Sequence, residues 1–138
     1  MKRGARLLAI LVSLGLLFGC ADDPTGLEAG EPFTLVPGER VTLESLGTHV
    51  RFLRVAGDSR CPLRAQCVWA GDGAVVFEIA PRDGDAVEHT LHTNEGPKAV
   101  VLGSYELRLL KLNPHPEVPG EIAPEDYRAT LVLYEQPE

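Results

Sequence analysis

The chain has 138 residues, of which 44% are hydrophobic and 24% are charged, and 20 acidic side chains against 13 basic ones give a net charge of −7. This length suits one domain with a modest hydrophobic core. A strongly acidic surface repels phosphate backbones, so nucleic acid is not an expected partner. We expect the negative charge to keep the domain soluble, with binding of cationic ligands or divalent ions as the alternative.

The amino terminus has the parts of an export signal. Three basic residues within the first six positions precede an apolar segment from Leu7 to about Phe18, and two aspartates follow at positions 22 and 23. A transmembrane helix needs roughly 20 consecutive apolar residues. The segment is therefore predicted to be a signal peptide and not a membrane span.

The end of this segment, Leu17-Phe18-Gly19-Cys20, resembles the lipobox of bacterial lipoproteins, in which a leucine stands three residues before a cysteine and a small residue directly before it. The resemblance implies a signal peptide over residues 1–19 and a diacylglyceryl group on the sulfur of Cys20. Two or more acyl chains anchor a protein stably, because each buried methylene contributes about 0.8 kcal/mol. Plain secretion is the alternative, but Leu17 suits an ordinary cleavage site poorly.

Processing at this site would leave 119 residues with ten basic and twenty acidic side chains, a net charge of −10. Ala21 stands where inner-membrane lipoproteins usually carry an aspartate, which implies the outer membrane if the organism is Gram-negative. Residues after Cys20 have no periodicity and little apolar content up to residue 31. We therefore predict a flexible tether over 20–31 and a folded domain over 32–138.

From Phe33 onward, apolar and polar residues alternate in short segments separated by Gly, Pro and Asp, as is typical of β-strands. Alternation is lost near Leu53, which predicts a β-bulge, and Asp83-Gly84 predicts a hairpin turn. The four prolines between residues 113 and 126 exclude a central strand there. The predicted strands are Arg40–Glu44, Thr48–Val55, Val75–Ile79, Val87–Leu91, Ala99–Leu102, Tyr105–Leu110 and Tyr127–Tyr134.

Seven or eight short strands, with no helix to cover a parallel sheet, predict an all-β fold. We expect an antiparallel β-sandwich, with a small barrel as the alternative. It is immunoglobulin-like only in the loose sense of two packed sheets, because Cys61 and Cys67 lie close together in the sequence and Trp69 follows the second of them.

Cys61 and Cys67 remain once Cys20 carries lipid. An even number of cysteines in an oxidising compartment predicts a disulfide, which would contribute roughly 2–3 kcal/mol by closing a short loop. Zinc is the alternative, although five residues separate these thiols and zinc knuckles usually have two to four. No second Cys or His pair follows at a matching spacing.

The most distinctive segment of the mature chain reads Asp58-Ser59-Arg60-Cys61-Pro62 and then Cys67-Val68-Trp69-Ala70-Gly71. It resembles a motif, D-S-R-C-P followed by C-x-W-x-G, of an uncharacterised group of small exported bacterial and archaeal proteins, many of them lipoproteins. The resemblance extends loosely to a later strand, the Pro-rich segment and the final strand. It implies a disulfide-closed loop between two strands with Trp69 at its base, and it supplies no reaction, cofactor or substrate.

Loops held by a rigid scaffold often form binding surfaces. This loop is therefore a candidate binding loop, formed by Asp58, Ser59, Arg60, Leu63, Arg64 and Trp69. Ser59, Arg60, Leu63 and Arg64 would be exposed, and the apolar face of Trp69 would pack over the loop.

The alternative for the same loop is a purely structural role, which we favour over binding. Asp58 would then accept hydrogen bonds from main-chain amides, Arg60 would pair with Asp58 or Asp72, and the loop would close one end of the sandwich.

Other candidate chemistry is weak. Gly57-Asp58-Ser59 resembles the opening of the GDS-type esterases, but the late Asp-x-x-His pair and the helices of their α/β fold are missing. His89 and His92 lie three apart on a predicted strand and so face opposite sides. His49 and His115 would join them only through folding that the sequence does not reveal.

The sequence therefore predicts no catalytic residue, no metal and no cofactor. We expect a lipid-anchored, non-enzymatic domain of the cell envelope that binds an envelope protein or small ligand, or plays a structural role. The alternative is a metal-binding or hydrolytic envelope protein that uses His89 and His92 or Ser59.

Overall fold

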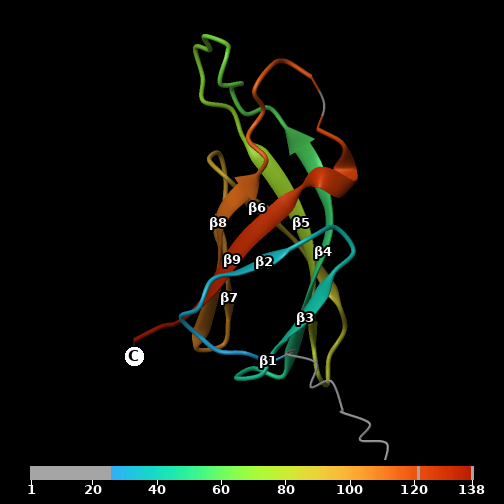
Figure 1. The fold of residues 1–138 in the computed structure, drawn as a ribbon. Coiled ribbons are helices and arrows are strands. Elements are labelled where there is room, and N and C mark those ends of the chain that lie inside the picture. The colour runs from blue at the N-terminus through green and yellow to red at the C-terminus, as the bar shows by residue number, and fades with distance from the viewer. Residues whose placement is uncertain (1–25, 121, 138) are drawn as a thin grey trace, which may run out of the picture.

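Residues 26–120 and 122–137 are described by a computed structural model, and they form two packed β-sheets (Figure 1). The predicted signal peptide and the lipidation site at Cys20 lie outside these residues. No helix within the described ranges is long and apolar enough to cross a membrane.

The first sheet has the strand order β1 (Gly26–Leu27), β3 (Arg40–Leu43), β4 (Thr48–Asp58), β5 (Gly73–Pro81) and β6 (Val87–His92). The second has the order β2 (Phe33–Leu35), β9 (Arg128–Glu135), β8 (Tyr105–Asn113) and β7 (Ala99–Leu102). Paired strands are antiparallel throughout the described chain except β1, which runs parallel to β3. The predicted all-β sandwich is confirmed, with nine strands in the described residues where seven or eight were expected.

The hydrophobic core lies between the sheets and contains the residues that the alternation pointed inward. Val75, Phe77 and Ile79 are all buried, as predicted for one face of their strand. The rings of Phe52 and Phe77 pack with centroids 5.5 Å apart. The second sheet contributes Leu107, Leu109, Leu112, Ala129, Leu131 and Leu133.

Bulges extend two of the strands. The register of β4 against β5 shifts between Phe52 and Arg54, which confirms the predicted bulge, and shifts again between Val55 and Gly57. Strand β4 therefore continues to Asp58, beyond its predicted end. A shift after Leu109 in β8 lets Leu112 as well as Leu109 face the core, because one extra residue reverses the alternation.

The domain begins earlier than predicted. Gly26 and Leu27 pair with β3, and the side chains of Leu27 and Ala29 pack against the core. The N–H of Gly30 donates to the carbonyl of Leu133 at 2.8 Å. The prediction of a flexible tether over 20–31 is therefore wrong for residues 26–31. The sequence did not indicate this strand, because two residues are too few to show an alternating pattern.

Two loops lie together at one end of the sandwich, which we call the apex (Figure 1). The disulfide loop, residues 59–72, joins β4 to β5. The Pro-rich loop, residues 114–126, joins β8 to β9 and ends in the 3-10 turn η1 (Pro124–Asp126). Its described residues, 114–120 and 122–126, hold no strand, as predicted. Strand β1 lies at the opposite end of the molecule.

Candidate functional site at the apex

A disulfide closes the loop between β4 and β5. Cys61 and Cys67 are bonded, with their Cα atoms 5.9 Å apart. The predicted disulfide is confirmed, and both sulfurs that a zinc site would need are used in it.

Arg60 is buried at the centre of the apex. Its Nε donates to Asp58 Oδ1 at 2.8 Å and its Nη2 donates to Asp58 Oδ2 at 2.6 Å. Its remaining hydrogen bonds reach the carbonyls of Leu112 (2.6 Å) and Pro114 (2.9 Å). One guanidinium therefore links the disulfide loop to the end of β8 and to the Pro-rich loop. The prediction that Arg60 is exposed is wrong, since the residue is only 7% exposed.

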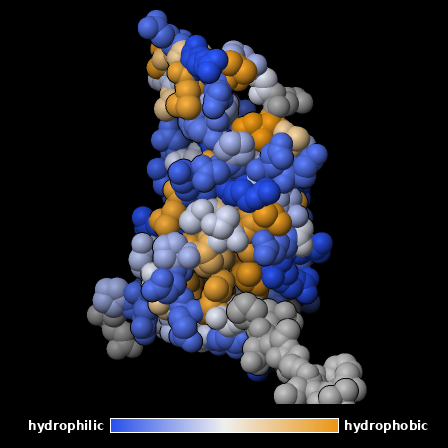
Figure 2. Space-filling view, viewed as in Figure 1, coloured by the Kyte–Doolittle hydropathy of each residue, from blue (hydrophilic) through white to orange (hydrophobic). Residues whose placement is uncertain are grey.

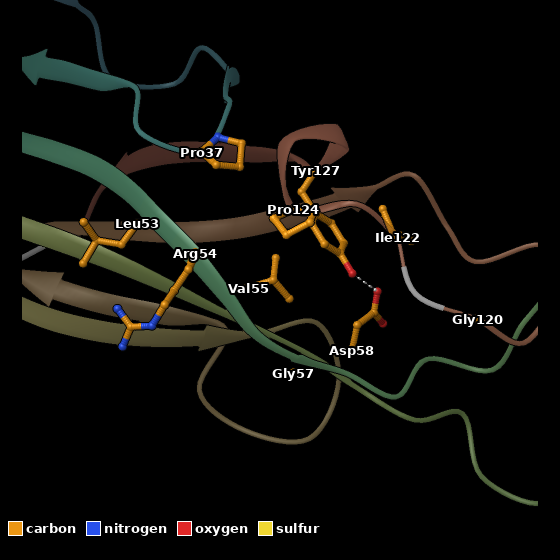
Figure 3. A pocket seen from close by; sticks show the side chains of 10 residues that line it. All are labelled: Pro37, Leu53, Arg54, Val55, Gly57, Asp58, Gly120, Ile122, Pro124 and Tyr127. Carbon is orange, nitrogen blue, oxygen red and sulfur yellow. Dashed lines mark hydrogen bonds between the residues drawn. The ribbon is translucent and has the colours of Figure 1, made fainter.

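Asp58 is the buried partner of Arg60. Its Oδ1 accepts a hydrogen bond from the main-chain N–H of Arg60, and its Oδ2 accepts one from the hydroxyl of Tyr127 at 3.0 Å (Figure 3). Burial alone would raise the pKa of Asp58, but the Arg60 guanidinium and the Tyr127 hydroxyl together hold it below its usual value. Both roles of the structural alternative, the Asp58 turn cap and the Arg60–Asp58 pair, are thus present.

The two apex loops are bonded along their main chains. The N–H groups of Leu63 and Arg64 donate to the carbonyls of Pro116 and Glu117, both at 2.9 Å. His115 Nε2 donates to the carbonyl of Cys61 at 2.8 Å. These contacts, added to those of Arg60, make the two loops one rigid unit.

Asp72 joins a third loop to this unit. Its carboxylate accepts hydrogen bonds from His92 Nδ1 (2.5 Å), from the hydroxyl of Thr93 (3.2 Å), and from the main-chain N–H groups of Asn94 (2.8 Å) and Glu95 (3.2 Å). Burial acts to raise the pKa of Asp72, but the His92 hydrogen bond and the two amides lower it to about 2. Asp72 thus remains a carboxylate that fixes the 92–95 segment.

Gly71 is required where the disulfide loop returns to β5. Its φ is +71°, and a Cβ built at this position would lie 1.8 Å from the carbonyl oxygen of Ser59. Only glycine fits both the conformation and the close approach of the two main chains.

Four large apolar side chains are exposed at the apex. Val68 is 89% exposed, Trp69 78%, Leu63 70% and Val118 52%, and we call this group the apolar tip. Figure 2 shows hydrophobic side chains at this end of the molecule, interspersed with hydrophilic ones. The prediction that Trp69 packs over its loop is wrong, because most of its side chain is exposed to solvent. Of the other predicted binding residues, Ser59 and Arg64 are exposed as expected.

A pocket of about 370 Å³ lies below the apex, between β4 and the end of the Pro-rich loop. Figure 3 shows Val55 and the ring of Tyr127 on its two sides, with Asp58 at the end where the hydroxyl of Tyr127 points. Arg54, at its edge, is directed away from Tyr127. The Asp58 oxygens that face this space already accept hydrogen bonds from Arg60 and Tyr127.

Of the side chains proposed for hydrolysis, Ser59 and His92 both contact Asp72, which was not among them, but they do not bond to each other. Asp72 orients His92 as the carboxylate of a Ser-His-Asp arrangement does. The hydroxyl of Ser59, however, donates to the carbonyl of Asp72 at 3.2 Å and accepts from its N–H at 3.1 Å. Ser59 therefore forms a main-chain turn contact, and its hydrogen bonds do not include an imidazole.

The histidines proposed as metal ligands are dispersed. His49 Nδ1 bonds with the hydroxyl of Thr42 at 3.0 Å, whereas His92 and His115 contact Asp72 and Cys61. Within residues 26–120 and 122–137, no three His, Cys, Asp or Glu side chains are arranged to hold a metal ion.

No protein-family model, curated protein or solved structure matches this chain.

Proposed function

We propose that the chain is a lipid-anchored, extracytoplasmic domain of the cell envelope that acts by binding at its apex and not by catalysis. The observation that carries this proposal is the apolar tip, whose four side chains are each more than half exposed. Apolar side chains grouped on a surface in this way are typical of interaction sites.

The rigidity of the apex supports a binding role. The disulfide, the Arg60 hydrogen bonds and the Asp72 contacts hold the loops in one arrangement. A rigid binding surface loses little conformational entropy when it engages a partner. The buried polar groups at the apex are thus the support, and the exposed apolar groups are the proposed contact surface.

The location of the apex also fits a tethered protein. A lipid on Cys20 would hold the β1 end of the domain near a membrane, because Cys20 precedes Gly26 by only six positions. The apex lies at the other end of the domain (Figure 1). Such a protein presents its apex away from its own anchor.

Crosslinking in intact cells tests the binding role. A photoreactive amino acid at Val68 is expected to give a crosslinked product, whereas the same group at the matched exposed residue Val87 is not. Both variants should unfold at the temperature of the unmodified protein, because both side chains project into solvent. Equal crosslinking at the two positions, or none at either, would contradict a specific apex site.

Labelling with a clickable fatty acid tests the anchor separately. We expect the protein to incorporate the label and the Cys20→Ser variant to lose it, with release from the membrane fraction. Unlabelled wild-type protein would contradict lipidation without bearing on the apex.

A further inference from the structure

We infer that the apolar tip inserts into the interfacial layer of a lipid bilayer facing the apex, a bilayer other than the one that holds the anchor. This inference rests on the proposed binding role of the apex and names its partner. Four features of the tip carry it: its shape, the absence of charge from its central part, the hydrogen bonds of the main chain that supports it and the type of its central residue.

The tip is convex. The disulfide loop and the Pro-rich loop project beyond the ends of the strands (Figures 1 and 2), and the apolar side chains are on these projections. A protein partner would need a cavity of matching shape to bury them, whereas the fluid interface of a bilayer adapts to any small projection. The shape therefore favours lipid.

Charged side chains are absent from the central part of the tip. Residues 65–71, Ala-Gln-Cys-Val-Trp-Ala-Gly, contain none, although 24% of the whole chain is charged. Arg64 precedes this run, and its exposed guanidinium lies 3.9 Å from the exposed carboxylate of Glu117. The long stem of Arg64 lets this charged pair stay at the level of the lipid headgroups while apolar neighbours go deeper. Glu95 lines the depression beside Trp69 and limits insertion to the interface.

The main chain that supports the tip is satisfied internally over residues 61–65. The N–H groups of Cys61 and Ala65 donate to the carbonyls of Ala70 and Pro62, and those of Leu63 and Arg64 donate to the Pro-rich loop. Prolines at 62, 116 and 119 carry no N–H at all. Entry into a layer poor in water costs least where such groups already have partners.

Tryptophan is the residue expected at the centre of an interfacial site. Its ring is large and apolar and its N–H is polar, so it is enriched where membrane meets water. Trp69 is also the only tryptophan of the chain. Its fluorescence consequently reports on the tip alone.

The test uses the full-length protein reconstituted in zwitterionic phosphatidylcholine vesicles, since an acidic protein is repelled by anionic lipid. A second population of vesicles with brominated acyl chains is then added. We expect Trp69 emission to shift to shorter wavelength and lose intensity, and its quenching by aqueous iodide to fall. Val68→Asp should abolish these changes, and Val87→Asp, a matched exposed valine at the other end of the sheet, should leave them unchanged.

Two results would overturn the inference. Trp69 emission that stays unshifted and open to iodide would exclude lipid insertion, and a specific crosslink from Val68 to a protein would then assign the apex to a protein partner. Quenching only when the brominated lipid is in the vesicle that carries the protein would place the tip in its own membrane. The second result requires the lipid on Cys20, but the first can also be obtained by adding the Cys20→Ser protein to brominated vesicles, so failure of the anchor is distinguishable.

Discussion

Replacement of Arg60 by leucine should be among the most destabilising single changes in this domain. The substitution removes two hydrogen bonds to Asp58 and those to the carbonyls of Leu112 and Pro114, and it leaves the Asp58 carboxylate buried without its counterion. Removing one partner of a buried ion pair costs about 3–5 kcal/mol. A domain of this size is stable by about 5–15 kcal/mol, so the loss is a large fraction of the total.

The exposed ion pair between Arg54 and Glu88 provides the matched control. Its shortest N–O distance is 3.1 Å, and the two side chains are 55% and 56% exposed. Arg54→Leu should change stability by less than about 1 kcal/mol. Urea unfolding of both variants, followed by far-ultraviolet circular dichroism without reductant, measures the difference.

A second variant separates the ion pair from packing. Adding Asp58→Asn to Arg60→Leu removes the uncompensated buried charge, so the double variant should be more stable than Arg60→Leu alone. If Arg60→Leu loses no more stability than Arg54→Leu, the assignment of Arg60 as the structural centre of the apex is refuted.

Three other changes test the apex at separate points. The pKa of Asp72 is about 2 in the folded protein, and that of an unfolded aspartate is about 3.9. Its carboxylate therefore stabilises the fold by roughly 2 kcal/mol at neutral pH, and this contribution is lost as the pH falls from about 4 to about 2. Asp72→Asn should flatten the stability profile measured over that range, and an unchanged profile would contradict this linkage. An alanine in the left-handed conformation lowers stability by roughly 1–2 kcal/mol. Gly71→Ala should lower it by well above this amount, because the new Cβ would collide with main chain. Gly103→Ala is the control and should lower stability by only this amount, because Gly103 has φ +63° and no atom lies near its Cβ position. Equal losses in thermal unfolding would show that the turn adjusts. Replacing Cys61 and Cys67 with alanine should lower the free energy of unfolding by roughly 2 kcal/mol, since the disulfide closes a loop between residues only six apart. A loss below about 0.5 kcal/mol would indicate that the other apex contacts already hold this loop.

The alternation of residue types was sufficient to predict the strands. Val75, Phe77 and Ile79 face the core because successive side chains on a strand point to opposite faces, and this property depends only on neighbours in sequence. The lost alternation near Leu53 located a bulge for the same reason. The disulfide followed from the number of cysteines and the expected compartment.

Of the apex contacts, only the local ones, the Asp58 turn contact and the Arg60–Asp58 pair, were predictable in this way. Arg60 was expected to be exposed and is buried, whereas Trp69 was expected to be packed and is exposed. The contacts responsible join residues far apart in sequence, such as Arg60 with Leu112 and Asp58 with Tyr127. No local pattern records them.

By itself, then, the order of residues determined the all-strand body, its turns and its covalent loop, because each depends on the spacing of side chains along a short stretch of chain. Only the tertiary structure decided which apex residues support and which project, because that depends on how the two sheets bring their loops to one end. The guanidinium of Arg60 is buried against the carbonyls of Leu112 and Pro114, whereas Trp69 is left on the surface.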